Sequence, residues 1–196
     1  MVKRIGIMLA GGESRRFGRP KAFALFNNKP IYDYVVEALR PFTEQLVVVS
    51  HPTLVNRFSE DPRLRVLVDD ERYIGRGPLA GLYTVMSQLD ADEYYLFPCD
   101  TPLVEEALVH WLASQGEAHP AANGIVPIAQ NRLQPLFGLY RKGCLSYIED
   151  LLESNSLKVR ALIDRANILS IPADTLPATL FYNVNTLDEL KEIDPF

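Results

Sequence analysis

Short continuous runs of apolar residues alternate along the chain with longer segments in which apolar residues recur every three or four positions. The continuous runs lie at Lys3 to Leu9, Gln45 to Ser50, Leu64 to Val68 and Tyr94 to Cys99. Such runs, bounded by glycine or polar residues, predict strands that are covered on both faces. Their alternation with helical segments predicts an α/β fold, with a mostly parallel central sheet and helices on both faces.

Several segments have the apolar spacing of helices that pack on such a sheet. The clearest begins at Pro78, a residue that suits the first helical turn. Its apolar positions are Leu79, Leu82, Tyr83 and Met86. Similar stripes begin at Ile31, after Thr101, at Leu145 and at Val159. A last helix is predicted from Thr186, because Glu189 three residues later completes a capping box.

The second half of the chain adds an antiparallel feature to this pattern. Residues 124–129 and 133–140 predict two strands, and the three residues between them suffice for a hairpin. A brief strand is also predicted at residues 168–171. We therefore expect a mixed sheet that includes some antiparallel strand, with a polar connection at residues 116–123 before the hairpin.

The first predicted strand runs into a segment rich in glycine and in positive charge. This segment contains Gly11, Gly12, Arg15, Arg16, Gly18, Arg19 and Lys21. Glycines let backbone N–H groups approach an anion closely, and the four cations supply charge. A flexible turn with solvated arginines explains the glycines but not four cations beside one strand end. We interpret the segment as a phosphate-binding loop at the carboxyl edge of the sheet, where such folds bind ligands.

Neither of the best-known phosphate-binding motifs describes this loop. The dinucleotide pattern needs glycines at other spacings, and the Walker pattern needs a lysine directly after the last glycine, followed by serine or threonine. Here Lys21 lies three residues after Gly18, and Ala22 follows it. The loop therefore belongs to another class of phosphate binder.

The composition narrows the class of protein. The chain has 196 residues, of which 47% are apolar and 23% charged, and we expect one soluble globular domain over residues 1–196. Its net charge of -5 argues against a nucleic-acid partner, and its apolar runs are too short for a membrane span. Cys99 and Cys144 form no metal-binding or disulfide pattern, which suits the cytoplasm.

Four motifs taken together resemble those of molybdenum cofactor guanylyltransferases. They are Leu9-Ala10-Gly11-Gly12 with Arg16, Gly18 and Lys21, then Gly77-Pro78-Leu79-Ala80-Gly81, Cys99-Asp100-Thr101-Pro102 and Asn183-Val184-Asn185-Thr186. Many nucleotidyltransferases share the first motif, whereas the combination is specific and spans residues 9–186. The resemblance implies a single Rossmann-like nucleotidyltransferase domain that transfers GMP from GTP to the phosphate of molybdopterin and releases pyrophosphate.

The resemblance also assigns roles within the loop. Lys21 and Arg16 would neutralise the β- and γ-phosphates and stabilise the departing pyrophosphate, helped by the N–H groups of Gly11 and Gly12. The guanine and ribose pocket would be lined by Leu9, Ala10 and Gly11.

Asp100 is the residue that we expect to bind Mg²⁺, because this ion prefers a carboxylate together with phosphate oxygens and waters. An alternative role is structural, since Asp100 or Thr101 would suit the N-cap of the next helix, and both roles can coexist. Cys99 is interpreted as buried filler, because direct phosphoryl transfer needs no covalent intermediate.

Three further residues are expected to contact the nucleotide. The resemblance places Asp70, seven residues before Gly77, on the guanine or ribose side, with Asp69 as a neighbour that is easily confused with it. Two solvated turn carboxylates are the alternative. Gly77 and Gly81 would let a helix start close to the nucleotide, or they serve ordinary helix packing.

The acceptor molybdopterin is expected near the end of the chain. The resemblance places Asn183 and Asn185 beside the acceptor or the cluster of metal and phosphates, and turn-forming asparagines are the alternative. Lys158 is a further candidate for the acceptor phosphate, although isolated cations on a short helix are usually solvated.

Two other classes of function remain open at this stage. One is a related transferase that uses CTP or makes a nucleotide sugar, in which the chemistry is the same and only base and acceptor differ. The other is a nucleotide-binding module without turnover, against which the presence of both Lys21 and Asp100 argues. The expected partners are GTP and molybdopterin, together with other cofactor-maturation proteins and molybdoenzyme chaperones.

Overall fold

The computed structural model of the chain describes residues 2–12 and 17–193 and is built around a mixed sheet. Within these residues the sheet has eight strands in the order β10-β7-β9-β6-β1-β4-β5, and β8 pairs with β7. Their bounds are β1 Arg4–Ala10, β4 Gln45–Ser50, β5 Leu64–Leu67, β6 Glu93–Pro98, β7 Gly124–Ala129, β8 Arg132–Leu133, β9 Gly138–Arg141 and β10 Ile168–Pro172. β9 runs antiparallel to both neighbours and β8 is antiparallel to β7, while every other pairing is parallel.

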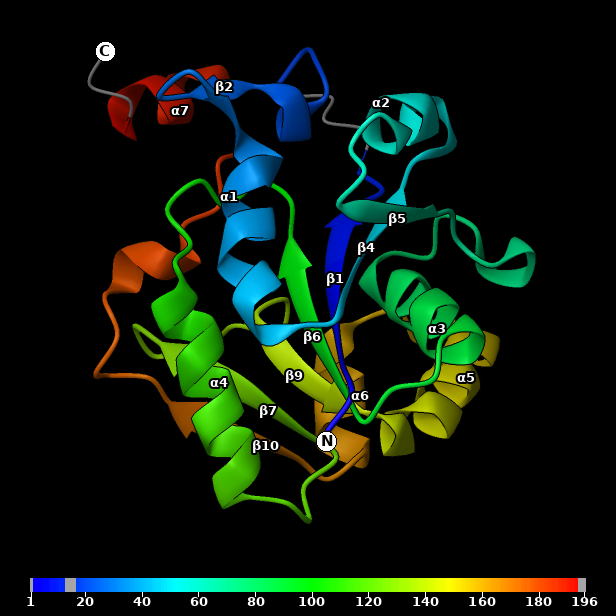
Figure 1. Cartoon of the computed structure of the whole chain (residues 1–196). Helices are drawn as coiled ribbons and strands as arrows, with labels where there is room; N and C mark the ends of the chain where they lie inside the picture. The colour runs from blue at the N-terminus through cyan, green and yellow to red at the C-terminus, as the bar shows by residue number, and fades with distance from the viewer. Residues whose placement is uncertain (1, 13–16, 194–196) are drawn as a thin grey trace.

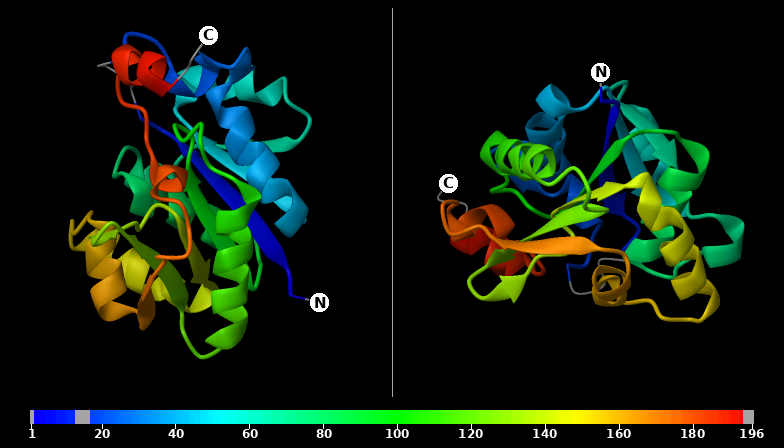
Figure 2. Two further views of the ribbon diagram at one scale, coloured as in Figure 1. Left: turned by 90° about the vertical axis from the view of Figure 1, so that its left-hand side faces the viewer. Right: turned by 90° about the horizontal axis from the view of Figure 1, so that it is seen from below.

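Helices cover both faces of this sheet (Figure 1). Their bounds are α1 Ile31–Leu39, α2 Val55–Ser59, α3 Pro78–Gln88, α4 Glu106–Ala118, α5 Leu145–Glu153, α6 Val159–Arg165 and α7 Leu187–Ile193. α1 and α4 pack on one face, whereas α3, α5 and α6 pack on the other. The view from below in Figure 2 shows the sheet between the two helical layers.

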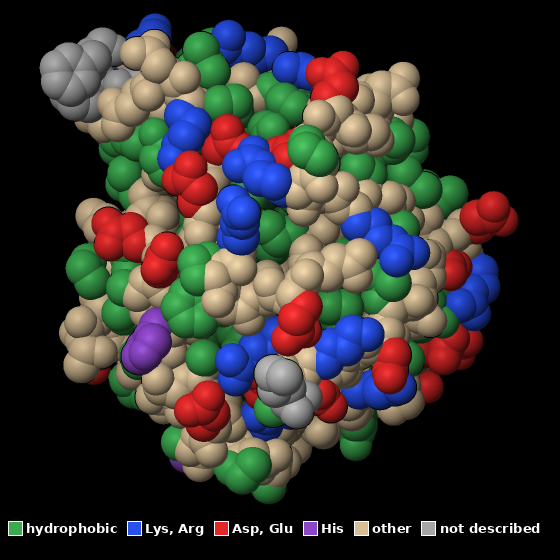
Figure 3. Space-filling view, viewed as in Figure 1, with side chains coloured by type: hydrophobic (Ala, Val, Ile, Leu, Met, Phe, Trp, Pro, Cys, Tyr) green, Lys and Arg blue, Asp and Glu red, His purple; other side chains and the backbone are tan. Residues whose placement is uncertain are grey.

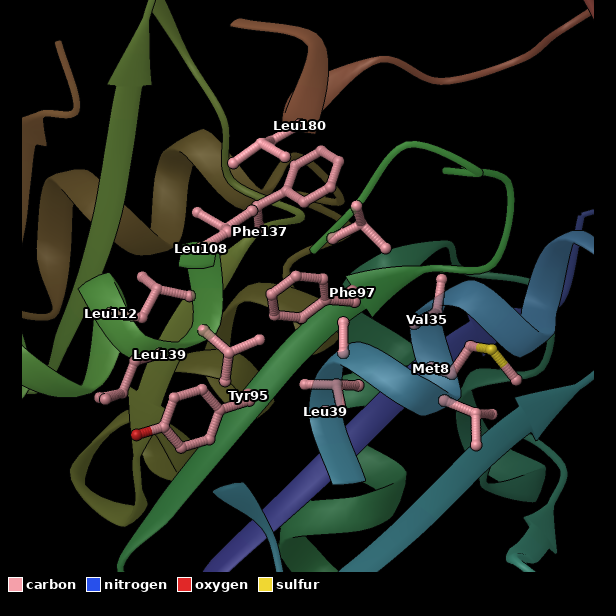
Figure 4. Packing of buried hydrophobic residues seen from close by; sticks show 14 of the residues in the cluster. Met8, Val35, Leu39, Tyr95, Phe97, Leu108, Leu112, Phe137, Leu139 and Leu180 are labelled. Carbon is pink, nitrogen blue, oxygen red and sulfur yellow. The ribbon is translucent and has the colours of Figure 1, made fainter. Parts of the chain in front are cut away.

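The two faces form separate apolar cores because successive strand side chains point to opposite sides. In β6, Tyr95 and Phe97 join the core under α1 and α4, while Tyr94 and Leu96 join the core under α3 and α5. Figure 4 shows the first of these cores, in which Phe97 and Phe137 lie close together. Their rings meet edge to face with centroids 5.6 Å apart. Continuous apolar strands are required because neither face is open to water.

A third and smaller apolar cluster lies beyond the carboxyl ends of β1 and β6. It contains Phe17, Ala24, Phe26, Ile31, Val184 and Leu190. These residues bring the beginning of the chain, including the hairpin of β2 (Leu25–Phe26) and β3 (Lys29–Pro30), against the C-terminal helix α7. Figure 1 and the left view of Figure 2 show α7 and this hairpin together at the end to which β1 and β6 point.

The predicted fold class is confirmed, and three local predictions are wrong. Residues 133–140 form not one strand but β8 and β9 with a turn between them. Gln130 and Asn131 both have positive φ, and they alone make the tight turn between β7 and β8. The connection predicted from residue 116 begins later, because α4 continues to Ala118.

The third error concerns the start of α4. The helix begins at Glu106 with Glu105 as its N-cap, so neither Asp100 nor Thr101 caps it. The Thr101 hydroxyl is buried and donates instead to the carbonyl oxygen of Pro98, 3.1 Å away. The segment after β6 therefore makes a separate turn before the helix. The sequence pattern also did not predict the β2–β3 hairpin or the short helix α2.

The exposed surface carries both signs of charge. On the face shown in Figure 3, Lys and Arg side chains lie beside Asp and Glu side chains and apolar groups. Several are paired, such as Lys29 with Glu37 and Arg63 with Asp33 and Asp61. None of the helices in residues 2–12 and 17–193 has the length and apolarity that crossing a membrane requires.

Candidate active site

An ion pair between Lys21 and Asp100 lies at the carboxyl edge of the sheet. The Lys21 Nζ atom donates to Asp100 Oδ2 at 2.5 Å, and the two side chains are only 17% and 13% exposed. The same ammonium group also donates to the carbonyl oxygen of Val184 at 3.2 Å and to Asn185 Oδ1 at 3.4 Å. The structure thus brings together residues from three of the four motifs that the sequence analysis singled out.

The sheet explains how Lys21 and Asp100 meet. Asp100 follows β6, and the glycine loop that leads to Lys21 follows β1, the parallel neighbour of β6. Lys21 begins the 3₁₀ helix η1 (Lys21–Phe23), which packs down on the sheet through the buried Ala22. Because parallel neighbours end at the same edge, two residues far apart in sequence reach one point.

Phe23 fixes the other end of η1. Its ring lies 4.6 Å from that of Phe58 and 5.4 Å from that of Tyr32, measured between centroids. The guanidinium carbon of Arg57 lies 3.7 Å from the centre of the Phe23 ring, which is cation–π distance. These contacts restrict the backbone on which Lys21 stands.

Residues 183–185 complete the cluster from the end of the chain. The backbone N–H of Val184 donates to the carbonyl oxygen of Asp100 at 2.9 Å, and its own carbonyl accepts from Lys21. The Val184 side chain is fully buried. This segment therefore contacts both members of the ion pair through its backbone.

Asn183 presents a buried oxygen in the same segment. Within the described residues its Oδ1 atom is the one buried side-chain polar atom without a hydrogen-bond partner. Leaving such an acceptor unpaired costs about 1–3 kcal/mol, which favours sites that a ligand, cation or water completes. The neighbouring Asn185 is exposed, and its Nδ2 donates to the Asn183 carbonyl at 3.3 Å.

The oxygen donors at this edge fit a Mg²⁺ site in which phosphate and water supply the remaining ligands. Asp100 supplies a carboxylate, and Asn183 and Asn185 supply amide oxygens. No group of three or more His, Cys, Asp or Glu residues suited to a metal occurs in the described part of the chain. The donor set therefore suits a metal that arrives with a phosphate ligand, not a closed protein cage.

The other predicted loop residues lie along the same edge. The Leu9 carbonyl accepts from the Cys99 N–H at 3.1 Å, and the Ala10 carbonyl accepts from the His51 N–H at 3.3 Å. Gly11 and Gly12 are exposed, and a Cβ atom added to either meets no described atom within 4 Å. Among the described residues, no atom therefore crowds the side of Gly11 or Gly12 on which a side chain would stand. Arg16 lies outside the described residues.

Asp69 and Asp70 follow β5, two strands away from β1 at the same edge. The Asp70 carboxylate caps a short 3₁₀ helix by accepting from the backbone N–H of Arg72, and this bond together with the Arg72 side chain lowers the pKa of Asp70. Burial raises the pKa of Asp69, whose Oδ2 accepts from the Gly75 N–H at 2.9 Å. Both carboxylates are thus engaged within their own loop.

Gly77 and Gly81, at the start of α3, are glycines for different structural reasons. Gly77 has φ 76° and ψ -159°, a conformation open essentially to glycine alone, and it is the N-cap of the helix. A Cβ atom on Gly81 would lie 2.6 Å from Leu9 Cδ2, so this glycine lets α3 pack closely on β1. Packing accounts for Gly81 without a nucleotide.

Lys158 lies apart from the ion pair, whereas Cys99 is the chain neighbour of Asp100. Lys158 is exposed at the N-cap of α6, and no contact within the described residues joins it to Lys21 or Asp100. Cys99 precedes Asp100, and burial, followed by the negative charge of Asp100, raises the pKa of its thiol. A neutral thiol at physiological pH agrees with its interpretation as filler.

A cavity of about 560 Å³ lies near this site but contains none of the predicted site residues. It is bounded by the β2–β3 hairpin, α1 and residues 102–107. Tyr34 and Phe26 contribute to its lining, and the hydroxyl of Tyr34 donates to the Phe26 carbonyl at 2.9 Å.

The sequence motifs assigned no role at the site to three residues that the structure places there. The Val184 carbonyl acts through the backbone, so the identity of its side chain does not reveal it. Phe17 is a buried residue just before Lys21, 1% exposed, and the motifs assign it no role. Glu189 was recognised as a helix cap, but its carboxylate reaches one residue beyond the cap, to the N–H of Asn185 at 2.6 Å.

Residues 6–169 match the MobA-like NTP transferase domain. The chain belongs to this family. Its sequence is 40% identical over 197 residues to the "Probable molybdenum cofactor guanylyltransferase" of Bacillus licheniformis, covering 100% of this chain and 98% of that protein. The protein of the same name from Halalkalibacterium halodurans is 38% identical over 191 residues, which cover 96% of each chain. The predicted resemblance is confirmed.

Solved structures show how widely this MobA-like fold is shared. Molybdopterin-guanine dinucleotide biosynthesis protein A from Archaeoglobus fulgidus superimposes with a TM-score of 0.82 at 21% identity, with 97% of each chain covered. A 4-diphosphocytidyl-2C-methyl-D-erythritol synthase from Anaerococcus prevotii superimposes with a TM-score of 0.76 at 8% identity, over 99% of this chain and 95% of that one. The fold thus serves enzymes named for different bases.

Proposed function

We propose that this protein transfers GMP from GTP to the phosphate of molybdopterin, releasing pyrophosphate and forming the guanine dinucleotide form of the cofactor. The observation that carries the proposal is the Lys21–Asp100 ion pair, held between the glycine loop and residues 183–185. The names of the relatives at 38% and 40% identity support the choice of GTP and molybdopterin. We place the reaction in the cytoplasm, because both cysteines are free.

The proposed reaction is an in-line displacement at the α-phosphorus of GTP. An oxygen of the molybdopterin phosphate forms a bond to this phosphorus while the bond to the β-phosphate oxygen breaks. Negative charge accumulates on the departing pyrophosphate, and the protein's task is to position the reactants and to stabilise this charge. No covalent intermediate on the protein is needed.

We assign to Lys21 the role of stabilising the negative charge on the departing pyrophosphate. Its ammonium group lies at Asp100 in the structure, so a triphosphate bound beside Asp100 lies within reach of the same group. The backbone N–H groups of Gly11 and Gly12 are the further donors that we assign to the phosphates. A fixed cation that requires no rearrangement of solvent stabilises the leaving group more than bulk water does.

Asp100 is the residue that we propose to hold Mg²⁺, with the amide oxygens of Asn183 and Asn185 nearby. When bound, Mg²⁺ would neutralise phosphate charge as a Lewis acid. The ion pair also orients the Asp100 carboxylate at the strand end. We assign the guanine and ribose side to Leu9, Ala10, Asp70 and Gly77, which lie along the same edge, and the acceptor side to Asn183, Asn185 and Lys158.

Pyrophosphate release tests the proposal. The protein would be incubated with molybdopterin and Mg²⁺ and with GTP, CTP or ATP in turn. We expect pyrophosphate release with GTP but not with CTP or ATP. We also expect EDTA to abolish this release by removing the metal. Release with CTP and not GTP contradicts the base assignment, and release with none contradicts an enzymatic role.

Asp100→Asn tests the metal assignment more cleanly than Asp100→Ala. Asparagine keeps the shape and an acceptor for Lys21, whereas alanine leaves a half-buried ammonium group without its carboxylate. We expect turnover to fall by at least about 100-fold in Asp100→Asn with little change in the unfolding temperature. Wild-type turnover in the folded variant would remove Asp100 from the metal site.

A further inference from the structure

The C-terminal segment, residues 182–193, lies beside the Lys21–Asp100 ion pair. It consists of an extended stretch and the helix α7. Its side chains contribute to neither of the two large cores but form the third apolar cluster with residues 17–31. The segment therefore packs on the part of the chain that carries Lys21.

The residues on either side of Lys21 are anchored in this cluster. Phe17 and Ala24, four residues before and three after Lys21, are 1% and 0% exposed. Val184 and Leu190 pack with them from the C-terminal segment. Removing these partners would take away the packing that Phe17 and Ala24 receive from the C-terminal segment.

A chain of hydrogen bonds links α7 to the ion pair. The Glu189 carboxylate accepts from the Asn185 N–H at 2.6 Å, and the Glu189 N–H donates to Thr186 Oγ1 at 3.1 Å. These two bonds fix the turn at the start of α7. The residue immediately before this turn is Val184, whose backbone bonds to both Lys21 and Asp100.

We infer that residues 182–190 form a C-terminal clamp that positions Lys21 and Asp100, and that Glu189 is its positioning residue. Glu189 contacts neither member of the ion pair within the described structure. It acts by holding the backbone at Asn185, and so the Val184 carbonyl and the Asn185 side chain, against the Lys21 ammonium group. The clamp is therefore a part of the phosphate-binding machinery that lies at the opposite end of the sequence.

Three substitutions on α7 test this inference. Glu189→Ala removes the acceptor for the Asn185 N–H, and Glu189→Gln keeps an acceptor oxygen while removing the charge. Glu192→Ala is the matched control, because it removes the same type of side chain from an exposed position of the same helix. All three are compared with the wild-type chain for thermal unfolding, for GTP binding with Mg²⁺, and for hydrogen exchange of residues 17–26.

We expect Glu189→Ala to weaken GTP binding about tenfold, which corresponds to one lost charge-assisted hydrogen bond. Exchange of residues 17–26 should become faster, because their packing partners loosen. Glu189→Gln should recover most of both properties, and Glu192→Ala should match the wild type. If α7 contributed to stability alone, Glu189→Ala would lower the unfolding temperature and leave GTP affinity at 25 °C unchanged.

The inference rests on the proposed function for its binding readout but not for its exchange readout. If the wild-type chain does not bind GTP, the proposed function fails, and hydrogen exchange alone decides the clamp. If Glu189→Ala exchanges like the wild type at residues 17–26, the clamp is overturned whether or not GTP binds. The inference is also overturned if Glu192→Ala has effects equal to those of Glu189→Ala.

Discussion

The ion pair between Lys21 and Asp100 shows what a single residue contributes at this site. The two residues are 79 positions apart, and each follows one of two neighbouring parallel strands. Lysine supplies a compact charge, and its acceptors among the described residues include a carboxylate, a backbone carbonyl and an amide oxygen. The arrangement is prepared before any phosphate binds, which reduces the cost of ordering the side chain.

Replacing Lys21 by glutamine is expected to lower kcat/KM for GTP by about 100-fold, with KM raised and kcat reduced. The cause is the loss of positive charge at the departing pyrophosphate. Steady-state kinetics measures this, with Lys29→Gln as a control that removes a lysine from a surface pair with Glu37. Equal losses in both variants would point to a general electrostatic effect and not to Lys21.

Gly11→Ala is expected to weaken GTP binding without changing the stability of the fold. No described atom lies within 4 Å of the added methyl group, so the free energy of unfolding should stay within about 0.5 kcal/mol of the wild type. GTP binding should weaken, because the methyl group occupies space that the phosphates need. Urea denaturation and a GTP titration check the two halves, and unchanged GTP affinity would exclude a close approach at Gly11.

At the scale of elements, a charged network ties α1 to the segment between α2 and β5. Arg63 bonds to Asp61 through two nitrogens and reaches Asp33 on α1. Asp61 is 8% exposed and accepts also from the Tyr32 hydroxyl at 3.2 Å. These bonds lower the pKa of Asp61, with the Arg63 side chain as the largest cause, while burial and the nearby carboxylates raise the pKa of Tyr32 to about 12.

The pH dependence of stability follows from the lowered pKa of Asp61. A carboxyl group with a lower pKa in the folded than in the unfolded chain stabilises fully above its unfolded pKa of about 3.9. This contribution is lost as the pH falls through the folded value. We expect Asp61→Asn to cost about 1–2 kcal/mol at pH 7, and the difference from wild type to shrink below about pH 4.

Urea denaturation of both proteins between pH 7 and pH 3 measures this difference. A constant difference over the whole range would mean that the Asp61 charge does not contribute. Because Tyr32 and Phe58 from this region also pack on Phe23, the same network supports η1 and hence Lys21.

At the scale of the whole molecule, one continuous sheet connects the two halves of the chain. β6 and β9 connect the parallel strands of the first half with β7 and β10 of the second half. Both large cores contain residues from both halves, such as Phe97 with Phe137 in one and Tyr94 with Tyr140 in the other. The prediction of one domain over residues 1–196 was made from length and composition, and this continuity supports it.

A single unfolding transition is the expected outcome for such a unit. Trp111 on α4 packs on the first core, so its fluorescence reports tertiary structure while far-ultraviolet circular dichroism reports helices and strands. The two signals should change at the same urea concentration. Two separate midpoints would contradict the one-domain prediction.

The sequence by itself determined the elements and the chemical groups. Continuous apolar runs fixed β1 and β4 almost to the residue, because strands covered on both faces leave no polar position. The motifs identified Lys21 and Asp100, because few residue types bind phosphate or Mg²⁺. The strand predicted over residues 133–140 failed, since periodicity alone does not show the turn that divides β8 from β9.

Only the tertiary structure decided which of these groups meet. Lys21 pairs with Asp100 because β1 and β6 are parallel neighbours, an order that local patterns do not encode. The position of Val184 depends on α7 packing against Phe17 and Ala24, residues from the other end of the chain. Such contacts arise from the burial of apolar surface in three dimensions, so a backbone carbonyl at residue 184 becomes part of the site without any signature in its side chain.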